Sequence, residues 1–246
     1  MKKRLLMAGI IFCTISVFAQ NNKRKNKEVV TYEIEEKTYQ QALRYGDVGV
    51  AVNSLYVLLA KHPDNNSYKD SLARIYFQVG SYNQCLRVCE ELLVAKPNDT
   101  TTLRMMAMSY KSLGNAVEAI AEFEKVVKLT GNVYDTYQKA ALEYNIKRLQ
   151  ESKISIELVL KLATDKHKIV LYIDQDNKQE VPLRAAAFNL YGMIAKDFND
   201  TASARFLFDE AIKIFPEFYF ANANLKALND LEAKKPEERA PLEKKK

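Results

Sequence analysis

The chain has 246 residues and a mass of 28.2 kDa, with seven glycines, six prolines and no tryptophan. This composition excludes collagen-like, disulfide-rich and low-complexity proteins, and the abundance of helix-forming residues favours an all-α fold. A formal net charge of +6 is typical of proteins that bind nucleic acid or an anionic surface, so its distribution along the chain determines whether such a partner is expected.

The first 19 residues have the pattern of a secretory signal peptide. Lys2, Lys3 and Arg4 precede a short apolar stretch, and small residues lead to a cleavage point before Gln20. The apolar stretch is shorter than the roughly 20 residues that a membrane-spanning helix needs, so an uncleaved anchor is the weaker alternative. We therefore expect an exported protein that is periplasmic or associated with the outer membrane.

The positive charge lies outside the region expected to fold. The signal peptide carries three positive charges, and residues 20–31 and 234–246 form two tails that each carry a net charge of +3. The intervening residues 32–233 are therefore slightly acidic, with a net charge of −3. Nucleic acid is not an expected partner, whereas weak, salt-sensitive contact of the tails with a membrane or cell wall is.

Five columns of residues recur every 34 positions, and each period contains two stretches with apolar residues at i, i+3, i+4 and i+7. This pattern predicts two amphipathic helices per period, separated by a glycine turn. A two-helix unit cannot bury its apolar face alone, so neighbouring units must stack. The columns are Gly46, Gly80 and Gly114; Pro63, Pro97 and Gly131; Ala51, Cys85 and Ala119; Leu55, Cys89 and Phe123; and Leu58, Leu92 and Val126.

The repeat resembles the tetratricopeptide repeat (TPR) family, in exported proteins of the kind found in Bacteroidota. The last unit keeps the family pattern best, through Phe188, Tyr191, Gly192, Ala195, Ala204, Phe208, Ala211 and Pro216. The resemblance implies an all-α helical solenoid of about five helix-turn-helix units, with units 1–4 over residues 32–165 and unit 5 plus a capping helix over 185–233. Unit 4 is irregular, because its second helix fits only after a slip of about two residues, which uses Ser155, Val159 and Leu162.

Residues 166–184 interrupt the repeats and predict a small β-hairpin. Ile169 to Ile173 is a run of β-branched and aromatic residues, and Glu180 to Leu183 is a candidate returning strand. Pro182 confines that second strand to an edge. Beyond residue 233, charged residues and prolines predict a disordered tail.

Residues able to carry catalysis are scarce. His62 lies beside an inter-unit proline and His167 at the mouth of the expected hairpin, so we interpret each as a solvated turn residue rather than a base or a ligand. Cys85 and Cys89 lie four residues apart on one predicted helix, in columns that hold apolar residues elsewhere, so we interpret them as buried thiols. We predict no catalytic residues, no metal site and no cofactor, and therefore a protein that is not an enzyme.

The TPR resemblance implies a concave groove made by the first helix of each unit. Its mixture of arginine, amide and apolar side chains suits a partner protein or an extended peptide. We therefore expect an adaptor or scaffold of the bacterial cell envelope; the alternative is a protein that binds peptidoglycan or another glycan. The candidate groove residues are Arg44, Arg74, Phe77, Arg104, Met108, Lys111, Gln138, Leu142, Asn145, Asn189 and Met193.

Overall fold

The computed structural model describes residues 33–238, with side chains described as far as residue 233. The predicted signal peptide and basic N-terminal tail lie outside the described residues, as does most of the predicted C-terminal tail. The chain divides into two compact units, each of which contains several of the helix-turn-helix repeat units. From here on, unit 1 (Met1–Ala95) and unit 2 (Lys96–Lys246) name these two compact units. No helix in residues 33–238 is long and apolar enough to cross a membrane.

Unit 1 contains helical residues 33–45 followed by α2 (Val48–Lys61), α3 (Asn66–Gln78) and α4 (Tyr82–Ala95). Gly46 makes the first turn at φ +68°, a left-handed conformation that glycine adopts without steric cost. The side chain of Asp47 then caps α2 by accepting a hydrogen bond from the Val50 amide at 3.0 Å. The helices bury one core between them, made of Tyr39, Ala42, Ala51, Leu55, Leu58, Tyr68, Leu72 and Ile75.

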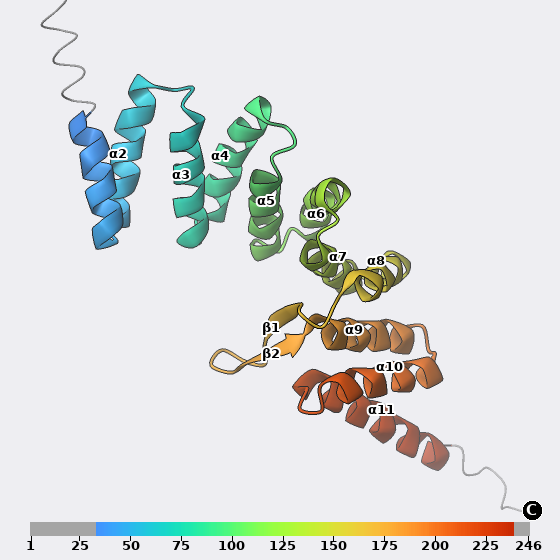
Figure 1. The fold of residues 1–246 in the computed structure, drawn as a ribbon. Coiled ribbons are helices and arrows are strands. Elements are labelled where there is room, and N and C mark those ends of the chain that lie inside the picture. Colours follow the sequence, from blue (N-terminus) through green and yellow to red (C-terminus); the bar gives the residue numbers. More distant parts are fainter. Residues whose placement is uncertain (1–32, 239–246) are drawn as a thin grey trace, which may run out of the picture. The chain divides into compact units, whose positions relative to one another are not determined.

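Unit 2 continues the pattern of paired helices and ends in a single long helix (Figure 1). Within each pair, the first helix packs against the second, and the first helix of the next pair follows. The pairs are α5 (Thr100–Ser112) with α6 (Ala116–Thr130), α7 (Val133–Asn145) with α8 (Leu149–Leu162), and α9 (Leu183–Asp197) with α10 (Thr201–Ile214); α11 (Tyr219–Glu238) follows them. These helices confirm the predicted fold of about five helix-turn-helix units and a capping helix. Helix α11 extends past the predicted folded limit at residue 233.

One glycine in unit 2 allows two helices to approach closely. Gly192 faces the buried ring of Phe208, and a Cβ atom placed on Gly192 would lie 2.5 Å from that ring. Helices α9 and α10 can therefore pack at this distance only because the position has no side chain. This explains in physical terms why the fifth unit keeps the glycine of the repeat pattern.

The turns of the fourth and fifth pairs use residues other than glycine. Lys147 and Asn199 adopt φ values of 62° and 64°. The turn at Lys147 comes 33 residues after Gly114, one residue earlier than the 34-residue period. The buried column of α8 shifts with it to Ser152, Ile156 and Val159, while Leu162 is 39% exposed. The predicted slip of about two residues, through Ser155, Val159 and Leu162, is therefore wrong at Leu162, although Ser155 and Val159 are buried.

The predicted hairpin is present, with a different end. Strands β1 (Lys168–Tyr172) and β2 (Lys178–Pro182) pair in antiparallel register, with Val170 opposite Glu180. Leu183, predicted to end the second strand, is instead the first residue of α9, and Pro182 is tolerated directly before that helix; the Leu183 amide still donates to the His167 carbonyl at 2.8 Å. The side chain of Gln179 fixes the hairpin to the start of α11: it donates to the Glu217 carbonyl at 2.7 Å and accepts from the Tyr219 amide at 3.1 Å.

Candidate partner-binding face

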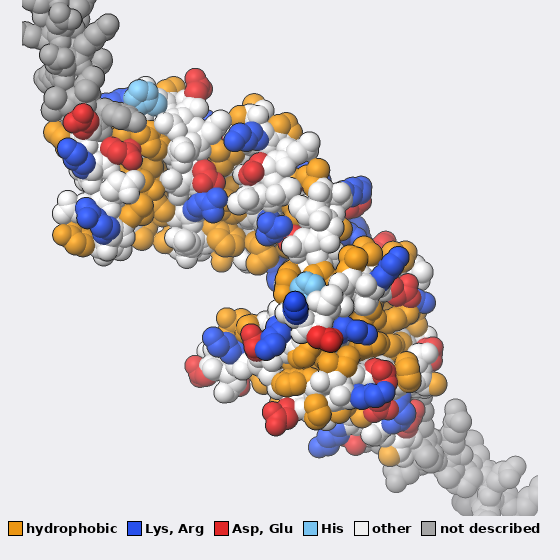
Figure 2. Space-filling view, viewed as in Figure 1, with side chains coloured by type: hydrophobic (Ala, Val, Ile, Leu, Met, Phe, Trp, Pro, Cys, Tyr) orange, Lys and Arg blue, Asp and Glu red, His pale blue; other side chains and the backbone are white. Residues whose placement is uncertain are grey.

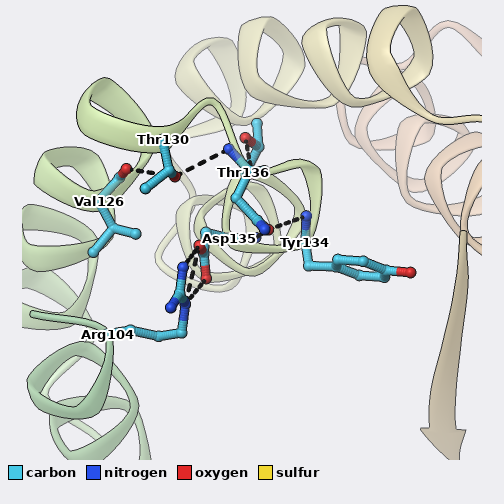
Figure 3. Close-up of polar contacts among 7 residues, drawn as sticks. Arg104, Val126, Thr130, Tyr134, Asp135 and Thr136 are labelled. Carbon is cyan, nitrogen blue, oxygen red and sulfur yellow. Dashed lines mark hydrogen bonds and ion pairs between the residues drawn. The ribbon is translucent and has the colours of Figure 1, made fainter. Parts of the chain in front are cut away.

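The first helices of unit 2 are joined to one another by side-chain bonds, and we call the surface on which these bonds lie the first-helix face. On α5, Arg104 donates from Nε and Nη2 to both carboxylate oxygens of Asp135 on α7, at 2.7 to 3.1 Å. Figure 3 shows this paired geometry, with the Tyr134 ring pointing away from it. The Asp135 side chain is only 6% exposed, so the pair holds α5 and α7 in a fixed arrangement.

A second bond between α5 and α7 lies about two helical turns further along α5 and about one turn further along α7. Lys111 donates from Nζ to the Gln138 side-chain oxygen at 2.5 Å. Partial desolvation lowers the pKa of the Lys111 ammonium. Lys111 forms no ion pair with a described residue, so a carboxylate brought by a partner would find a cation there. Met108, between Arg104 and Lys111 on α5, is half-buried and offers an adaptable apolar contact.

The α9 and α11 end of the first-helix face carries amides and a methionine. The Asn224 side chain on α11 donates to the Asn189 side-chain oxygen on α9 at 2.9 Å. Among the described residues, the amide nitrogen of Asn189 has only the sulfur of Met193 as acceptor, at 3.8 Å. Since thioether sulfur is a weak acceptor, this buried amide retains the capacity to donate to a peptide carbonyl.

Two of the predicted groove residues differ sharply in exposure. Leu142 on α7 is 6% exposed and belongs to the core cluster around Phe123, so it supports the face from beneath. Asn145, at the end of α7, is exposed. Near it Lys147 forms an ion pair with Asp197 of α9 at 2.8 Å, which links α7 to α9 and raises the pKa of Lys147.

The remaining three predicted groove residues belong to unit 1. Arg74 is exposed and forms an ion pair with Asp70 on its own helix, at 2.7 Å. Phe77 is half-buried and meets the Tyr82 ring edge-on, with 5.9 Å between centroids. Arg44 lies at the exposed end of the first described helix. The first-helix face, as defined for unit 2, does not include these residues.

Sequence reasoning missed two members of the first-helix face. Asp135 was not a candidate, although it is the partner that fixes Arg104. Asn224 was assigned only to the capping helix, although it bonds to Asn189. A comparison of Asn189 with the residue about one repeat period later would have pointed to Asn224. No sequence signal marks the pairing of Arg104 with Asp135, because it depends on how the two helices stack.

The two cysteines and His167 occupy structural positions. Cys85 and Cys89 are fully buried thiols that are not joined in a disulfide, and each lies in the core of unit 1. The thiol of Cys85 and burial raise the pKa of Cys89, which keeps it protonated. His167 bonds through Nδ1 to the Thr164 amide at 2.9 Å, as part of a turn. Within residues 33–233, no group of three or more His, Cys, Asp or Glu side chains could hold a metal ion.

Three features define a helical repeat scaffold: stacked helix pairs, side chains that bridge first helices, and structural roles for His167 and for the thiols of Cys85 and Cys89. The family of TPR repeats described as "Psidin, N-terminal TPR repeats region" matches residues 33–169, which is more than half of the chain. The chain therefore belongs to this TPR family. TPR proteins are typically non-enzymatic scaffolds that mediate protein–protein interaction, and no catalytic family is indicated.

Solved structures show the same fold at low sequence identity. A TPR protein from Parabacteroides merdae ATCC 43184 aligns with a TM-score of 0.64 at 16% identity, over 84% of this chain and 75% of that chain. A double mutant of MamA from strain RS-1 aligns with a TM-score of 0.57 at 22% identity, over 69% and 85%. YrrB, described as a TPR protein with an unusual peptide-binding site, aligns with a TM-score of 0.59 at 18% identity, over 80% and 88%.

Proposed function

We propose that this protein is a non-enzymatic adaptor of the bacterial cell envelope, which binds an extended segment of a partner protein on the first-helix face of unit 2. The observation that carries the proposal is the set of fixed bonds between consecutive first helices: Arg104 to Asp135, Lys111 to Gln138 and Asn224 to Asn189. These bonds hold polar groups in place before a ligand arrives, which reduces the entropy lost on binding.

The chemistry of the first-helix face suits a peptide. Asn189 supplies an amide donor whose one acceptor within residues 33–233 is a sulfur, and a peptide backbone carbonyl is a better acceptor. Met108 and Met193 are half-buried and flexible, so they can contact apolar side chains of different shapes. Lys111 can receive a carboxylate, whose charge would offset the desolvation that lowers its pKa. The preferred ligand is therefore an extended peptide with apolar and acidic side chains.

Site-specific photocrosslinking in the cell of origin tests this proposal. A benzoylphenylalanine placed at Met108 or at Met193 reports contacts on the first-helix face. The matched control is Leu129, which is 47% exposed on α6, a second helix. The proposal expects one discrete crosslinked protein from Met108 and Met193 and none from Leu129. Crosslinks of equal yield from all three positions, or from Leu129 alone, contradict it.

Export, in the manner of Bacteroidota envelope proteins, is part of the same proposal and rests on the sequence of residues 1–19. Signal-peptide cleavage would leave Gln20 as the first residue, which N-terminal sequencing or intact mass of the protein from fractionated cells can measure. Retention of Met1 in a cytoplasmic fraction would contradict the envelope location. That result would not bear on peptide binding by the first-helix face, which the photocrosslinking experiment tests.

A further inference from the structure

A second apolar surface lies on unit 2, away from the first-helix face. Figure 2 shows hydrophobic side chains gathered over α8, α9 and α10. Two pockets of about 550 and 520 Å³ lie there, and both are lined by α9 and α10. The α9 residues in them follow one helical face: Arg184, Phe188, Tyr191, Ala195 and Phe198. Because these positions are four or three residues apart, both pockets lie along the same face of α9, and we call the two together the α9 groove.

The walls of the α9 groove are formed by α8, the segment that follows it, and α10. Helix α10 contributes Phe206, which is 61% exposed, and Phe198 at the end of α9 is 47% exposed. The hydroxyl of Tyr191 donates to Glu157 of α8 at 2.7 Å, so its polar end is bonded and its ring remains in the groove. Exposed aromatic rings beside pockets of this size are typical anchor sites for the apolar side chains of a partner.

One end of the α9 groove carries an unpaired cation. Arg184 lines the 520 Å³ pocket, and its Nε is enclosed and has no hydrogen-bond partner among the described residues. Of the charged groups in the same pocket, Lys213 pairs with Glu210 at 3.4 Å, and neither Glu210 nor Asp165 forms an ion pair with Arg184. Since Nε is enclosed, an incoming carboxylate would pair with the terminal nitrogens of the half-buried Arg184 guanidinium, which form no hydrogen bond with a described residue.

The corresponding pocket of unit 1 provides a contrast. It lies between α2, α3 and α4, has a volume of about 350 Å³, and is lined in part by Tyr56, Tyr76, Lys69 and Glu91. There the two tyrosine hydroxyls bond to each other at 2.6 Å, and Lys69 forms an ion pair with Glu91 at 2.7 Å. The two tyrosines and this ion pair are therefore satisfied internally. The other cation of that pocket, Arg87, is exposed, whereas Arg184 of the α9 groove is half-buried with an enclosed Nε that lacks a partner among the described residues.

We infer that the α9 groove binds an amphipathic α-helix of a partner protein, whose apolar side chains enter the two pockets and whose carboxylate pairs with Arg184. A helix fits because its apolar residues recur every three or four positions, as do the residues along the face of α9 that they would meet. The carboxylate requirement follows from the charge of Arg184. This site is independent of peptide binding by the first-helix face.

A helix-display selection tests the inference on the chain from Gln20 to Lys246. The probe is a phage library built on one amphipathic helical scaffold, with apolar residues varied on one stripe and Glu, Gln, Lys and Ser varied at its flanks. Selected helices are then titrated as synthetic peptides. The inference expects binders that carry Glu at one end, lose at least 10-fold in affinity with Phe206→Glu, and lose about 5-fold or more with Arg184→Gln.

The matched control is Arg87→Gln, which changes an arginine in the unit 1 pocket and should leave the affinity of those helices unchanged. Circular dichroism of each variant establishes that loss of binding is not loss of folding. Helices that bind Phe206→Glu as well as the parent, or that show no preference for Glu, overturn the inference. A concentration-dependent dimer that Phe206→Glu abolishes would also overturn it, because the occupant would then be a second copy of the chain. Loss of binding with Met108→Glu alone would assign the helices to the first-helix face instead.

Discussion

Arg104 of α5 and Asp135 of α7 face each other as a paired guanidinium and carboxylate, with Nη2 and Oδ2 2.7 Å apart. Asp135 is almost fully enclosed, whereas the Arg104 side chain is 39% exposed. The pair therefore neutralises a buried carboxylate at the boundary between two repeat units, and it fixes part of the proposed binding face.

Removal of this cation should destabilise unit 2. Arg104→Ala leaves the Asp135 carboxylate enclosed without its charged partner, and we expect a loss of about 1 to 3 kcal/mol, below that of a fully buried pair because Arg104 is partly exposed. Urea unfolding followed by circular dichroism measures it. Arg74→Ala is the matched control, since its ion pair with Asp70 is exposed on both sides and should contribute less than about 1 kcal/mol. Equal losses in the two variants would contradict this account.

The absence of a side chain at Gly192 should be essential for packing. In Gly192→Ala the new Cβ would meet the Phe208 ring at 2.5 Å, and we expect a loss of about 1 to 3 kcal/mol from overpacking. Thermal unfolding measures the change. Gly49→Ala is the control, because its Cβ would have 3.6 Å to the nearest atom and alanine favours a helix by about 1 kcal/mol. A Gly192→Ala protein as stable as Gly49→Ala would show that α9 and α10 are further apart than the structure gives.

The two thiols of α4 should report the opening of unit 1. Cys85 and Cys89 are fully buried, with their sulfurs 3.9 Å apart, and only the thiolate form reacts with a disulfide reagent. In the chain that begins at Gln20, we expect labelling at pH 8 to be slow in buffer and rapid in urea. Ser112→Cys adds an exposed thiol on α5 as a control and should react at once. Rapid labelling of all thiols in buffer would contradict burial of Cys85 and Cys89.

The hairpin turn should loosen in acid. Hydrogen bonds from the Asn177 side chain and backbone, and from the Asp176 amide, lower the pKa of Asp174 below its ordinary value of 3.8. Because the folded pKa is depressed, these bonds stabilise the turn above the unfolded value and are lost as the pH falls through the folded one. We expect the NMR amide signals of Asp176 and Asn177 to shift together below pH 3.8, and Asp174→Asn to remove that titration. A titration that persists in Asp174→Asn would assign it to another group.

Much of the fold could be predicted from the sequence, because a two-helix unit repeated at a fixed step leaves few ways to bury its apolar stripe. The glycine turns at Gly46, Gly80 and Gly114 have the left-handed φ values that the repeat implies. The register of α8 could not be predicted, since Lys147 takes a conformation usually reserved for glycine and shortens the period locally. Residue exposure was also hard to infer: Leu142, which the pattern places on the open face, is buried against Phe123 and its neighbours.

Side-chain bonds between neighbouring repeat units were the hardest feature to predict from the sequence. Asp135 acquires its role only when α5 and α7 stack, and Arg184 is notable only because no described carboxylate reaches it. The periodic pattern predicts which helices meet, but the polar partners across the boundary depend on exact stacking angles. The first-helix face depends on such partners, whereas the α9 groove depends on Arg184 having no acceptor among the described residues.

The most direct test of the central claim is a titration of the first-helix face with a peptide of known sequence. Random 12-residue peptides are selected on the chain from Gln20 to Lys246, and the best binder is titrated by calorimetry against the parent and three variants. We predict that Met108→Glu and Met193→Glu each weaken binding by at least 10-fold, while Phe206→Glu, on the α9 groove, leaves it unchanged. Binding that is unaffected by both methionine substitutions would contradict the claim that the first-helix face receives the partner.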